Sequence, residues 1–171
     1  LSKVCSVAIW MRASSQIWNT RVTCDVHVRT TSTRLAYCAG SLPTLGSVLA
    51  GTTASDFEPE EIHRRTSLST SVIRCSFKGA ALNLLDTPGS PSFIGEIRSA
   101  LRVADGIILV VSAVMGVRSE IQRLWASIHD AGLPCIVFVN DLDKDGTDFA
   151  ETVDALVKEL EITAVPLTVP T

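Results

Sequence analysis

Two continuous apolar runs with a helical pattern between them constrain the fold of this chain more than any other feature of the sequence. The runs are residues 106–111 (GIILVV) and 134–139 (PCIVFV), and strands that are apolar throughout are typical of a sheet covered on both faces. Between them, residues 121–128 repeat apolar side chains at helical spacing, and Gly132 marks the end of that helix. A strand, a crossover helix and a second strand in this order indicate two parallel strands of one sheet.

The rest of the chain continues the alternation of strands and helices and adds one hairpin. Residues 71–77 and 80–85 have strand patterns, and Lys78 and Gly79 between them form a tight turn, which predicts an antiparallel hairpin. The remaining predicted elements are a helix over residues 30–39, a long polar loop over 41–65, a helical stripe over 93–104, a helix over 149–160 with Thr147 as its N-cap, and a short strand over 164–169. The expected fold class is α/β, with a mostly parallel sheet, crossover helices and one antiparallel hairpin.

The composition indicates a globular domain and narrows its class. The chain has 171 residues, of which 46% are hydrophobic and 19% charged, so one core can form. Its longest apolar run, residues 106–117, is too short to cross a bilayer. A net charge of -3 excludes a general basic field for nucleic acid. Five cysteines without a C-x-x-C pair indicate neither a zinc site nor a disulfide framework, which fits a reducing compartment.

The first 34 residues differ from the rest in charge. They contain five basic residues and one acidic residue, and they are rich in Ser and Thr. This is the composition of a mitochondrial transit peptide, but no clean amphipathic helix accompanies it. The alternative hypothesis is a fragment whose true start is missing.

A carboxylate follows the predicted strand over residues 80–85. Ligands of an open α/β sheet bind at the carboxyl ends of its strands, and this end carries Asp86, Thr87, Pro88 and Gly89. Asp86 is suited to hold Mg²⁺ directly or through water, and the N–H of Gly89 is suited to bond a terminal phosphate. The alternative is an ordinary Asp-x-Pro-Gly turn.

A second acidic loop, NDLD at residues 140–143, follows the predicted strand over 134–139. An ionised Asp143 can accept both N–H donors on the edge of a guanine, a pair that adenine lacks, and Asn140 can bond the base or brace the loop. The alternative is a solvated loop at a strand end. Asp86 and Asn140 are 54 residues apart, with helix, strand, helix and strand between them, so the pattern predicts both on one edge of the sheet.

Four collinear segments resemble one family of nucleotide-binding domains. They are GTTASDFEPEE at residues 51–61, LLDTPG at 84–89, GEIRSALRVADGIILVVSAVMGV at 95–117 and VNDLDKDGTDF at 139–149. Together they are similar to the GTP-binding domain of elongation factor G, the translational GTPase that promotes translocation on the ribosome. The similarity is greatest to the divergent elongation factor G-like paralogues, and it runs from about residue 30 to residue 171.

The resemblance implies a function and a domain organisation. It implies binding of GTP or GDP with Mg²⁺, and GTP hydrolysis coupled to a ribosomal step of translation elongation. The ribosome is then the partner, through domains absent here, with no membrane or DNA partner. The chain is expected to be a cytoplasmic monomer, with mitochondria as the second location. Residues 1–28 are expected to be a segment unlike the family, for which disorder is one hypothesis, and 29–171 a partial translational GTPase domain truncated at its C-terminus.

The resemblance also assigns roles to individual residues. Asp86 and Gly89 match the family's Mg²⁺ and γ-phosphate contacts, and residues 140–143 match its guanine-specificity motif, normally Asn-Lys-x-Asp. Residues 52–69 match the first switch loop, called the switch loop below. In that loop Ser67 replaces a Thr that reaches Mg²⁺ in the family, and it keeps a hydroxyl.

The phosphate-binding loop of the family is altered in this chain. The family pattern is G-x-x-x-x-G-K-[ST], whose backbone N–H groups surround the phosphates. At the matching positions Thr23 and Val28 replace the glycines, Arg29 replaces the Lys, and Thr30 supplies the hydroxyl for Mg²⁺. Side chains at the glycine positions crowd the phosphates and disfavour a positive φ. Residues 46–53 (GSVLAGTT) imitate the spacing without the flanking strand and helix, which predicts a turn of the switch loop rather than a phosphate site.

Two further departures concern hydrolysis and base recognition. Ser90 replaces the family's water-positioning His, so hydrolysis is expected to be slow or differently assisted, and no catalytic residue is assigned. Asp141 replaces the Lys of the guanine motif, which removes a cation from the base and adds repulsion toward the phosphates. Arg64 and Arg65 are either a contact for ribosomal RNA or a solvated charge pair.

These observations leave two hypotheses of different classes. The first is a GTP-binding domain that is a GTPase by resemblance. The second is a nucleotide-incompetent fragment or binding module that keeps the GTPase fold without its activity, and the altered phosphate-binding loop favours it. A phosphate-accepting receiver domain is excluded, because no acidic pair precedes the first predicted strand.

Overall fold

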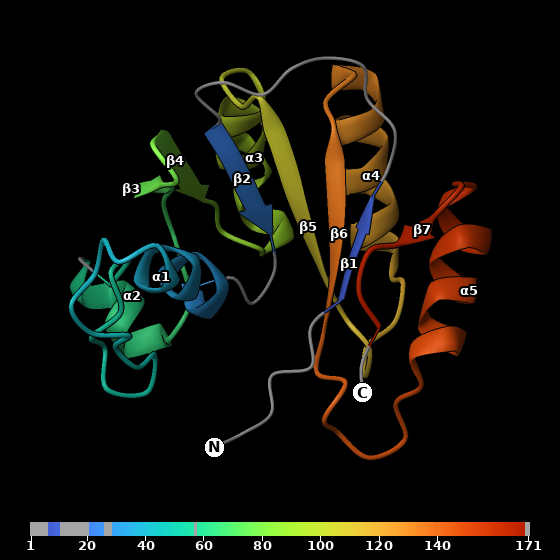
Figure 1. The fold of residues 1–171 in the computed structure, drawn as a ribbon, viewed down its shortest axis with the longest axis horizontal. Helices are drawn as coiled ribbons and strands as arrows, with labels where there is room; N and C mark the ends of the chain where they lie inside the picture. The colour runs from blue at the N-terminus through green and yellow to red at the C-terminus, as the bar shows by residue number, and fades with distance from the viewer. Residues whose placement is uncertain (1–6, 11–20, 26–28, 57, 170–171) are drawn as a thin grey trace. The chain divides into compact units, whose positions relative to one another are not determined.

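A computed structural model of the chain describes residues 7–10, 21–25, 29–56 and 58–169 (Figure 1). The chain divides into two compact units. The hairpin unit consists of Ser15–Ile107, and the crossover unit joins Leu1–Ser14 to Ile108–Thr171. Strand β5 (Gly106–Ser112) begins in the hairpin unit and runs mostly in the crossover unit.

Three strands of the hairpin unit lie in the order β3, β4, β2. They are β2 (Arg21–Asp25), β3 (Ser71–Phe77) and β4 (Ala80–Asp86). β3 is antiparallel to β4 with Ser71 opposite Asp86, and β2 is parallel to β4 with Cys24 opposite Asp86. Lys78 and Gly79 both have positive φ, 49° and 83°, as a tight two-residue hairpin turn requires. The predicted hairpin is therefore confirmed.

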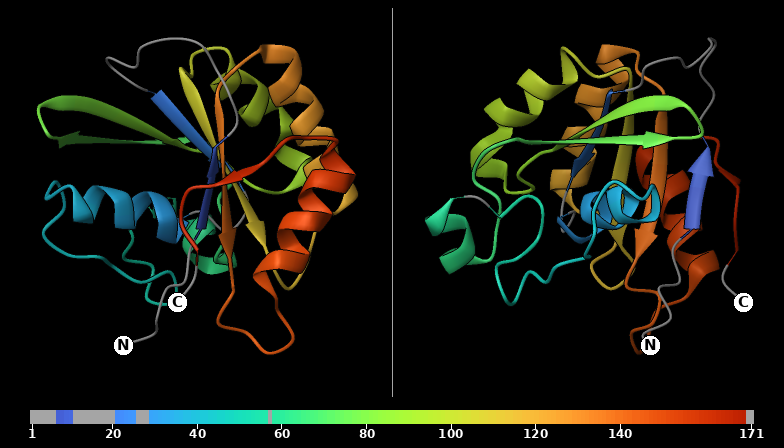
Figure 2. Two further views of the ribbon diagram at one scale, coloured as in Figure 1. Left: turned by 45° about the vertical axis from the view of Figure 1, so that its right-hand side comes forward. Right: turned by 60° about the vertical axis from the view of Figure 1, so that its left-hand side comes forward.

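Helix α1 (Arg29–Cys38) packs against this hairpin and forms the small core of the unit. Ala36 of α1 is buried in one cluster with Ile73 of β3 and Leu84 of β4. Figure 2 shows α1 running along one side of the hairpin. The helix ends within one residue of its predicted end, since Gly40 follows with a φ of 72°.

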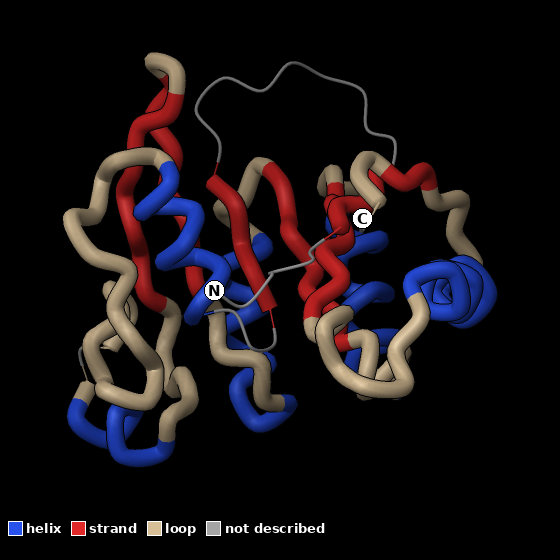
Figure 3. The backbone as a smooth tube through the Cα atoms, turned by 60° about the horizontal axis from the view of Figure 1, so that its bottom comes forward, coloured by secondary structure: helices blue, strands red, loops and turns tan. Residues whose placement is uncertain are grey.

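The segment between α1 and β3 contains a short helix where the sequence predicts only a polar loop (Figure 3). This helix, α2 (Pro59–Arg64), starts with a Pro in its first turn and ends at Arg65, which has a left-handed φ of 57°. The buried residue of α2 is the acidic Glu61. Because α2 has six residues and no apolar stripe, periodicity gives no sign of it.

The helices that apolar stripes predict are present. They are α3 (Ile94–Leu101), which follows a 3-10 turn (Pro91–Phe93), α4 (Ser119–Ala131) and α5 (Phe149–Leu160). Each buries residues of its predicted stripe, among them Ile97 of α3, Leu124 of α4 and Leu156 of α5. α4 ends at Gly132 with a left-handed φ of 65°, as predicted.

The predicted N-cap of α5 is wrong by one residue. The cap is Asp148, whose carboxylate accepts a 2.9 Å hydrogen bond from the N–H of Glu151. The hydroxyl of Thr147 donates instead to the carbonyl of Lys144, at 2.8 Å. Thr147 is thus used in the preceding turn, and the carboxylate beside it satisfies the first turn of the helix.

Four strands of the crossover unit follow the order β5, β6, β1, β7. Besides β5 they are β1 (Val7–Trp10), β6 (Cys135–Asn140) and β7 (Val165–Pro166). β1 is antiparallel to both neighbours, with Val7 opposite Val139 and Ile9 opposite Pro166. The fold is therefore mixed α/β, with antiparallel pairs beyond the predicted hairpin, and the mostly parallel sheet stays a prediction.

The N-terminal segment contains regular structure. β1 and β2 both fall within residues 1–28, and the disorder of this segment stays a prediction. Residues 1–6, 11–20 and 26–28 lie outside the described residues. The boundary at residues 28 and 29 stays a prediction.

The core of the crossover unit comes from the two apolar runs and from α4 and α5. Its most deeply buried side chains are those of Leu109, Val110, Val111, Ile128, Val137, Val139 and Leu156. Cys135 is buried as predicted, and burial raises the pKa of its thiol to about 12. Among the described residues, no helix is both long enough and apolar enough to cross a membrane.

Candidate nucleotide site

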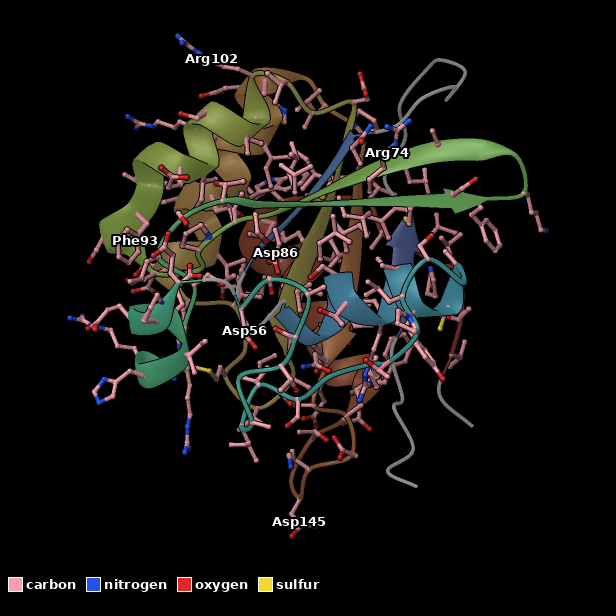
Figure 4. All side chains as sticks on the ribbon, turned by 90° about the vertical axis from the view of Figure 1, so that its left-hand side faces the viewer. Asp56, Arg74, Asp86, Phe93, Arg102 and Asp145 are labelled. Carbon is pink, nitrogen blue, oxygen red and sulfur yellow. The ribbon has the colours of Figure 1, made fainter. Side chains whose placement is uncertain are left out.

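The predicted phosphate side of the site lies in the hairpin unit, where Asp86 ends β4 (Figure 4). The residue is 1% exposed, and the hydroxyl of Ser32 on α1 donates a 2.8 Å hydrogen bond to its Oδ2 atom. The topology explains this contact: β2 is parallel to β4 and α1 follows β2, so α1 begins at the end of the sheet where Asp86 lies. A buried carboxylate beside a hydroxyl is a pair of hard oxygen donors, the type that Mg²⁺ binds.

The hydroxyl of Ser32 contacts this carboxylate, and the resemblance places the Mg²⁺ hydroxyl two residues earlier, at Thr30. The sequence does not single out Ser32, because residues 30–33 (TTST) are four hydroxyl residues in a row. Among the three whose side chains the structure describes, Ser32 and Thr33 are almost completely enclosed and Thr31 is half-buried. The three-dimensional contact shows that Ser32 is bonded to the carboxylate.

The altered phosphate-binding loop lies largely outside the described part of the chain. Val28 is not described, and Thr23 is described only as a backbone position of β2, opposite Leu85. Arg29 and Thr30 are the first two residues of α1, but their side chains are outside the described ones. The crowding of the phosphates and the contacts of Arg29 and Thr30 therefore stay predictions.

The residues after Asp86 form a tight connection to the 3-10 turn before α3. Thr87 and Pro88 are buried and Gly89 is half-buried. Ser90 precedes the turn, and its carbonyl accepts the N–H of Phe93 at 2.9 Å. The role of the Gly89 N–H toward a phosphate stays a prediction.

Residues 46–53 form a turn that is closed on itself. The N–H of Ser47 donates to the Thr52 hydroxyl at 3.0 Å, and the N–H of Thr52 donates back to the Ser47 carbonyl at 3.1 Å. The N–H of Gly51 also bonds inside the turn, to Val48 at 3.2 Å. These amides are therefore used within the turn. The geometry agrees with the prediction of a turn rather than a phosphate site.

The structure places Ser67 of the switch loop between α2 and β3. The residue is half-buried. It precedes by four residues Ser71, which lies opposite Asp86 in the hairpin. The chain thus brings the end of the switch loop toward the end of β4, and the Mg²⁺ contact of Ser67 stays a prediction.

The predicted base-reading loop begins where β6 ends, in the crossover unit. The carbonyl of Asn140 accepts the N–H of Ala113 at 2.9 Å. Asp141 has a left-handed φ of 62°, and its Oδ2 atom accepts the hydroxyl of Ser112 at 2.6 Å. The residue that replaces the family's Lys therefore ties the loop to the end of β5.

Asp143, the predicted guanine acceptor, is exposed in the same loop. Figure 4 shows the nearby Asp145 at the tip of this loop. Asn140 and Asp143 thus share one loop, and the carboxylate of Asp143 is accessible to a ligand. Asp86 belongs to the other unit, so the common sheet edge of Asp86 and Asn140 stays a prediction.

The Arg64 and Arg65 pair has two different environments. Arg64 forms an exposed ion pair with Glu60, one helical turn earlier on α2. The hydrogen bond from Arg64 is the main reason that the pKa of Glu60 lies below its usual value. Arg65 is the left-handed residue that ends the helix. For Arg64 this geometry favours the solvated charge pair.

The fold defines the class of this protein, and the comparisons with known proteins define its family. The chain is a mixed α/β domain with a buried carboxylate at a strand end. Residues 28–169 match the family model of the elongation factor Tu GTP binding domain. The chain belongs to this family, and it is similar in sequence to elongation factor G.

Three relatives illustrate the relationship. Elongation factor G of Thermotoga petrophila is 36% identical over 146 residues, which are 85% of this chain and 21% of that protein. Mitochondrial ribosome-releasing factor 2 of Yarrowia lipolytica is 34% identical over 85% of this chain and 18% of its own length. A crystal structure of a Thermus thermophilus protein is 36% identical, with a TM-score of 0.77 over 84% of this chain and 22% of that one. The chain spans about a fifth of the length of these relatives.

Proposed function

We propose that this chain binds GTP and GDP with Mg²⁺ and that, in a longer protein, GTP hydrolysis is coupled to a ribosomal step of translation elongation. The observation that carries the proposal is the buried pair of Asp86 and Ser32 at the end of β4, in a member of a GTP-binding family. Two relatives are named as elongation factor G and ribosome-releasing factor 2, which supports a ribosomal partner. A cytoplasmic monomer is the proposed state, and mitochondria are the second location.

The donor set of the hairpin unit fits Mg²⁺. Asp86 offers a carboxylate and Ser32 a hydroxyl, and these two oxygen groups already contact one another out of contact with water. We propose Asp86, Ser67 and Thr30 as the metal-binding residues, with Ser32 beside them. When bound, Mg²⁺ would neutralise charge on the phosphates.

We propose the contacts of the nucleotide residue by residue. Arg29 and the N–H of Gly89 would bind the phosphates, and Asn140 and Asp143 would bind the guanine. The exposed carboxylate of Asp143 supports its role, because it can accept two N–H donors at once. We assign no catalytic residue, since the Ser90 hydroxyl cannot polarise water as an imidazole does. Hydrolysis by the chain alone should be slow.

The second candidate is a binding module that keeps the GTPase fold without binding nucleotide. Two observations favour it: Val28 occupies a position where the family has Gly, and Asp141 occupies a position where the family has Lys. The first substitution removes backbone freedom from the phosphate-binding loop, and the second removes positive charge from the base-reading loop.

Equilibrium titration with a fluorescent GTP analogue in Mg²⁺ separates the two candidates. Saturable binding that GTP and GDP displace, but ATP does not, is the expected result. Omission of Mg²⁺ should weaken this binding. A folded chain that shows no saturable binding would refute the proposal and leave the binding module.

A further inference from the structure

Glu61 is the buried member of an otherwise exposed acidic cluster. Glu58 and Glu60 face solvent, whereas Glu61, on the same short helix α2, is 1% exposed. Burial of a carboxylate is costly unless hydrogen bonds replace the lost water. The position of Glu61 therefore depends on the groups that surround its side chain.

Those groups include backbone amides at the end of the switch loop. The Oε1 atom of Glu61 accepts the N–H of Leu68 at 2.7 Å and the N–H of Ser69 at 3.2 Å. The backbone carbonyl of Glu61 accepts the N–H of Thr66 at 3.2 Å. One residue thus holds the chain on both sides of Ser67.

A second glutamate accepts the backbone N–H of Thr70, the residue that follows Ser69. Glu96 of α3 accepts the N–H of Thr70 at 2.9 Å through its Oε2 atom. Hydrogen bonding from Thr70 is the main reason that the pKa of Glu96 lies below its usual value. Side chains from two helices therefore hold the main chain from Leu68 to Thr70, directly before β3 begins.

None of the side chains of residues 66–70 is fully buried. Leu68 is only half-buried, and Thr66 is exposed. Helix α2 has six residues, which is too short to be stable alone. Its Ile62 side chain lies against Gly51, where an added Cβ would come within 2.5 Å of it. The helix is thus anchored by Gly51 on one side and by the bonds of Glu61 on the other.

We propose that Glu61 is a positioning residue of the switch loop: its carboxylate fixes the peptides that follow Ser67 and so sets the place of the Ser67 hydroxyl. Release of the Leu68 and Ser69 amides from Glu61 is then the local step that frees this end of the loop. The consequence for Mg²⁺ and nucleotide rests on the proposed function. The stabilisation of the loop by the Glu61 hydrogen bonds does not depend on the proposed function.

Amide hydrogen exchange of the nucleotide-free chain tests the hold on the loop. Glu61→Ala should raise the exchange rates of Leu68 and Ser69 about tenfold or more, because a hydrogen bond to a charged acceptor is lost. Glu61→Gln keeps an acceptor without its charge and should give a smaller increase, about threefold. The matched control is Glu60→Ala, which removes the exposed neighbour on the same helix and should leave both rates unchanged.

Protection of Cys75 and Leu84 in the hairpin reports whether each variant is folded. Unchanged rates at Leu68 and Ser69 in a folded Glu61→Ala chain would overturn the inference. If Glu61→Ala does not fold, Glu61→Gln decides alone, and rates equal to those of the native chain would overturn the inference in the same way.

The link to Ser67 is tested by the Mg²⁺ concentration that half-saturates binding of the fluorescent GTP analogue. Glu61→Ala and Ser67→Ala should each raise it, and the double variant should raise it no further than the larger single effect, since both act through one hydroxyl. Additive effects would overturn the positioning role. A native chain that binds no nucleotide defeats the proposed function, while the exchange experiment still decides whether Glu61 holds the loop.

Discussion

Two neighbouring buried hydroxyl groups on α1 differ in their hydrogen bonding. Ser32 donates to Asp86, whereas the Thr33 hydroxyl has no hydrogen-bond partner among the described residues. Ser32→Ala deprives a buried carboxylate of a donor and should lower the free energy of unfolding by about 1–3 kcal/mol. Thr33→Val removes an unbonded hydroxyl at the same shape, so its effect should be neutral or stabilising. Urea unfolding measures both, and equal losses would contradict the assignment of Ser32.

The residue at the position of the family's lysine has acquired a structural contact. Asp141 combines a left-handed backbone with a short hydrogen bond from Ser112. Asp141→Lys puts back the family residue but loses this bond and places a long side chain at a positive φ, so it should destabilise the chain by about 1–3 kcal/mol. Asp141→Asn tolerates the same φ and keeps an acceptor, and should cost about 1 kcal/mol or less. Thermal unfolding compares the two, and a Lys variant as stable as the Asn variant would refute the role of this contact.

At the scale of elements, the sequence predicts those helices and strands that have a local pattern, and it does not predict those that depend on contacts with distant residues. α3 and α4 follow from apolar stripes, and the hairpin follows from its Lys78 and Gly79 turn, because these signals are local. α2 and β1 are missed for another reason. α2 depends on hydrogen bonds made by Glu61, and β1 depends on pairing with β6, which is distant in the sequence. Neither partner can be identified from the pattern of a single segment.

The same division applies to the candidate site. Asp86, Asn140 and Asp143 are predictable because each follows a buried strand, and the structure puts each at or just beyond a strand end. Ser32 is not predictable, because the sequence does not distinguish it from the three hydroxyl residues adjacent to it. The joint action of the two strand ends on one nucleotide remains a prediction.

Two glycines of similar φ differ in what surrounds them. Gly46 and Gly40 have φ values of 69° and 72°, but a Cβ on Gly46 would lie 2.2 Å from the Thr52 carbonyl oxygen, whereas nothing lies within 4 Å of one on Gly40. Gly40→Ala should cost about 1 kcal/mol, the backbone term alone. Gly46→Ala should cost at least about 1 kcal/mol more, because it must open the closed turn. Urea unfolding of both variants measures the difference, and equal costs would show that the turn yields freely.

At the scale of the whole molecule, the net charge does not favour nucleotide binding, so any binding must depend on individual contacts within a site. The net charge is -3, so no general attraction draws a polyanionic ligand to the chain. The chain also spans about a fifth of its relatives' length, and the ribosomal role is a proposal. The contribution that we propose for this domain is recognition of the nucleotide, through a small number of specific hydrogen bonds.

A single substitution can test whether the proposed site selects guanine over adenine. The carboxylate of Asp143 offers two acceptor oxygens to the paired N–H donors of guanine, whereas an amide offers only one, so Asp143→Asn leaves one guanine donor facing an amide N–H. An unpaired donor costs about 1–3 kcal/mol, so affinity for GTP should fall about tenfold or more, while the weak affinity for ATP should not fall with it. Asp145→Asn makes the same change in charge at the loop tip and should leave both affinities unchanged. Competition against the fluorescent analogue measures the affinities of both variants for both nucleotides. If the two variants weaken GTP equally, charge rather than base recognition governs binding, and Asp143 is not the residue that selects guanine.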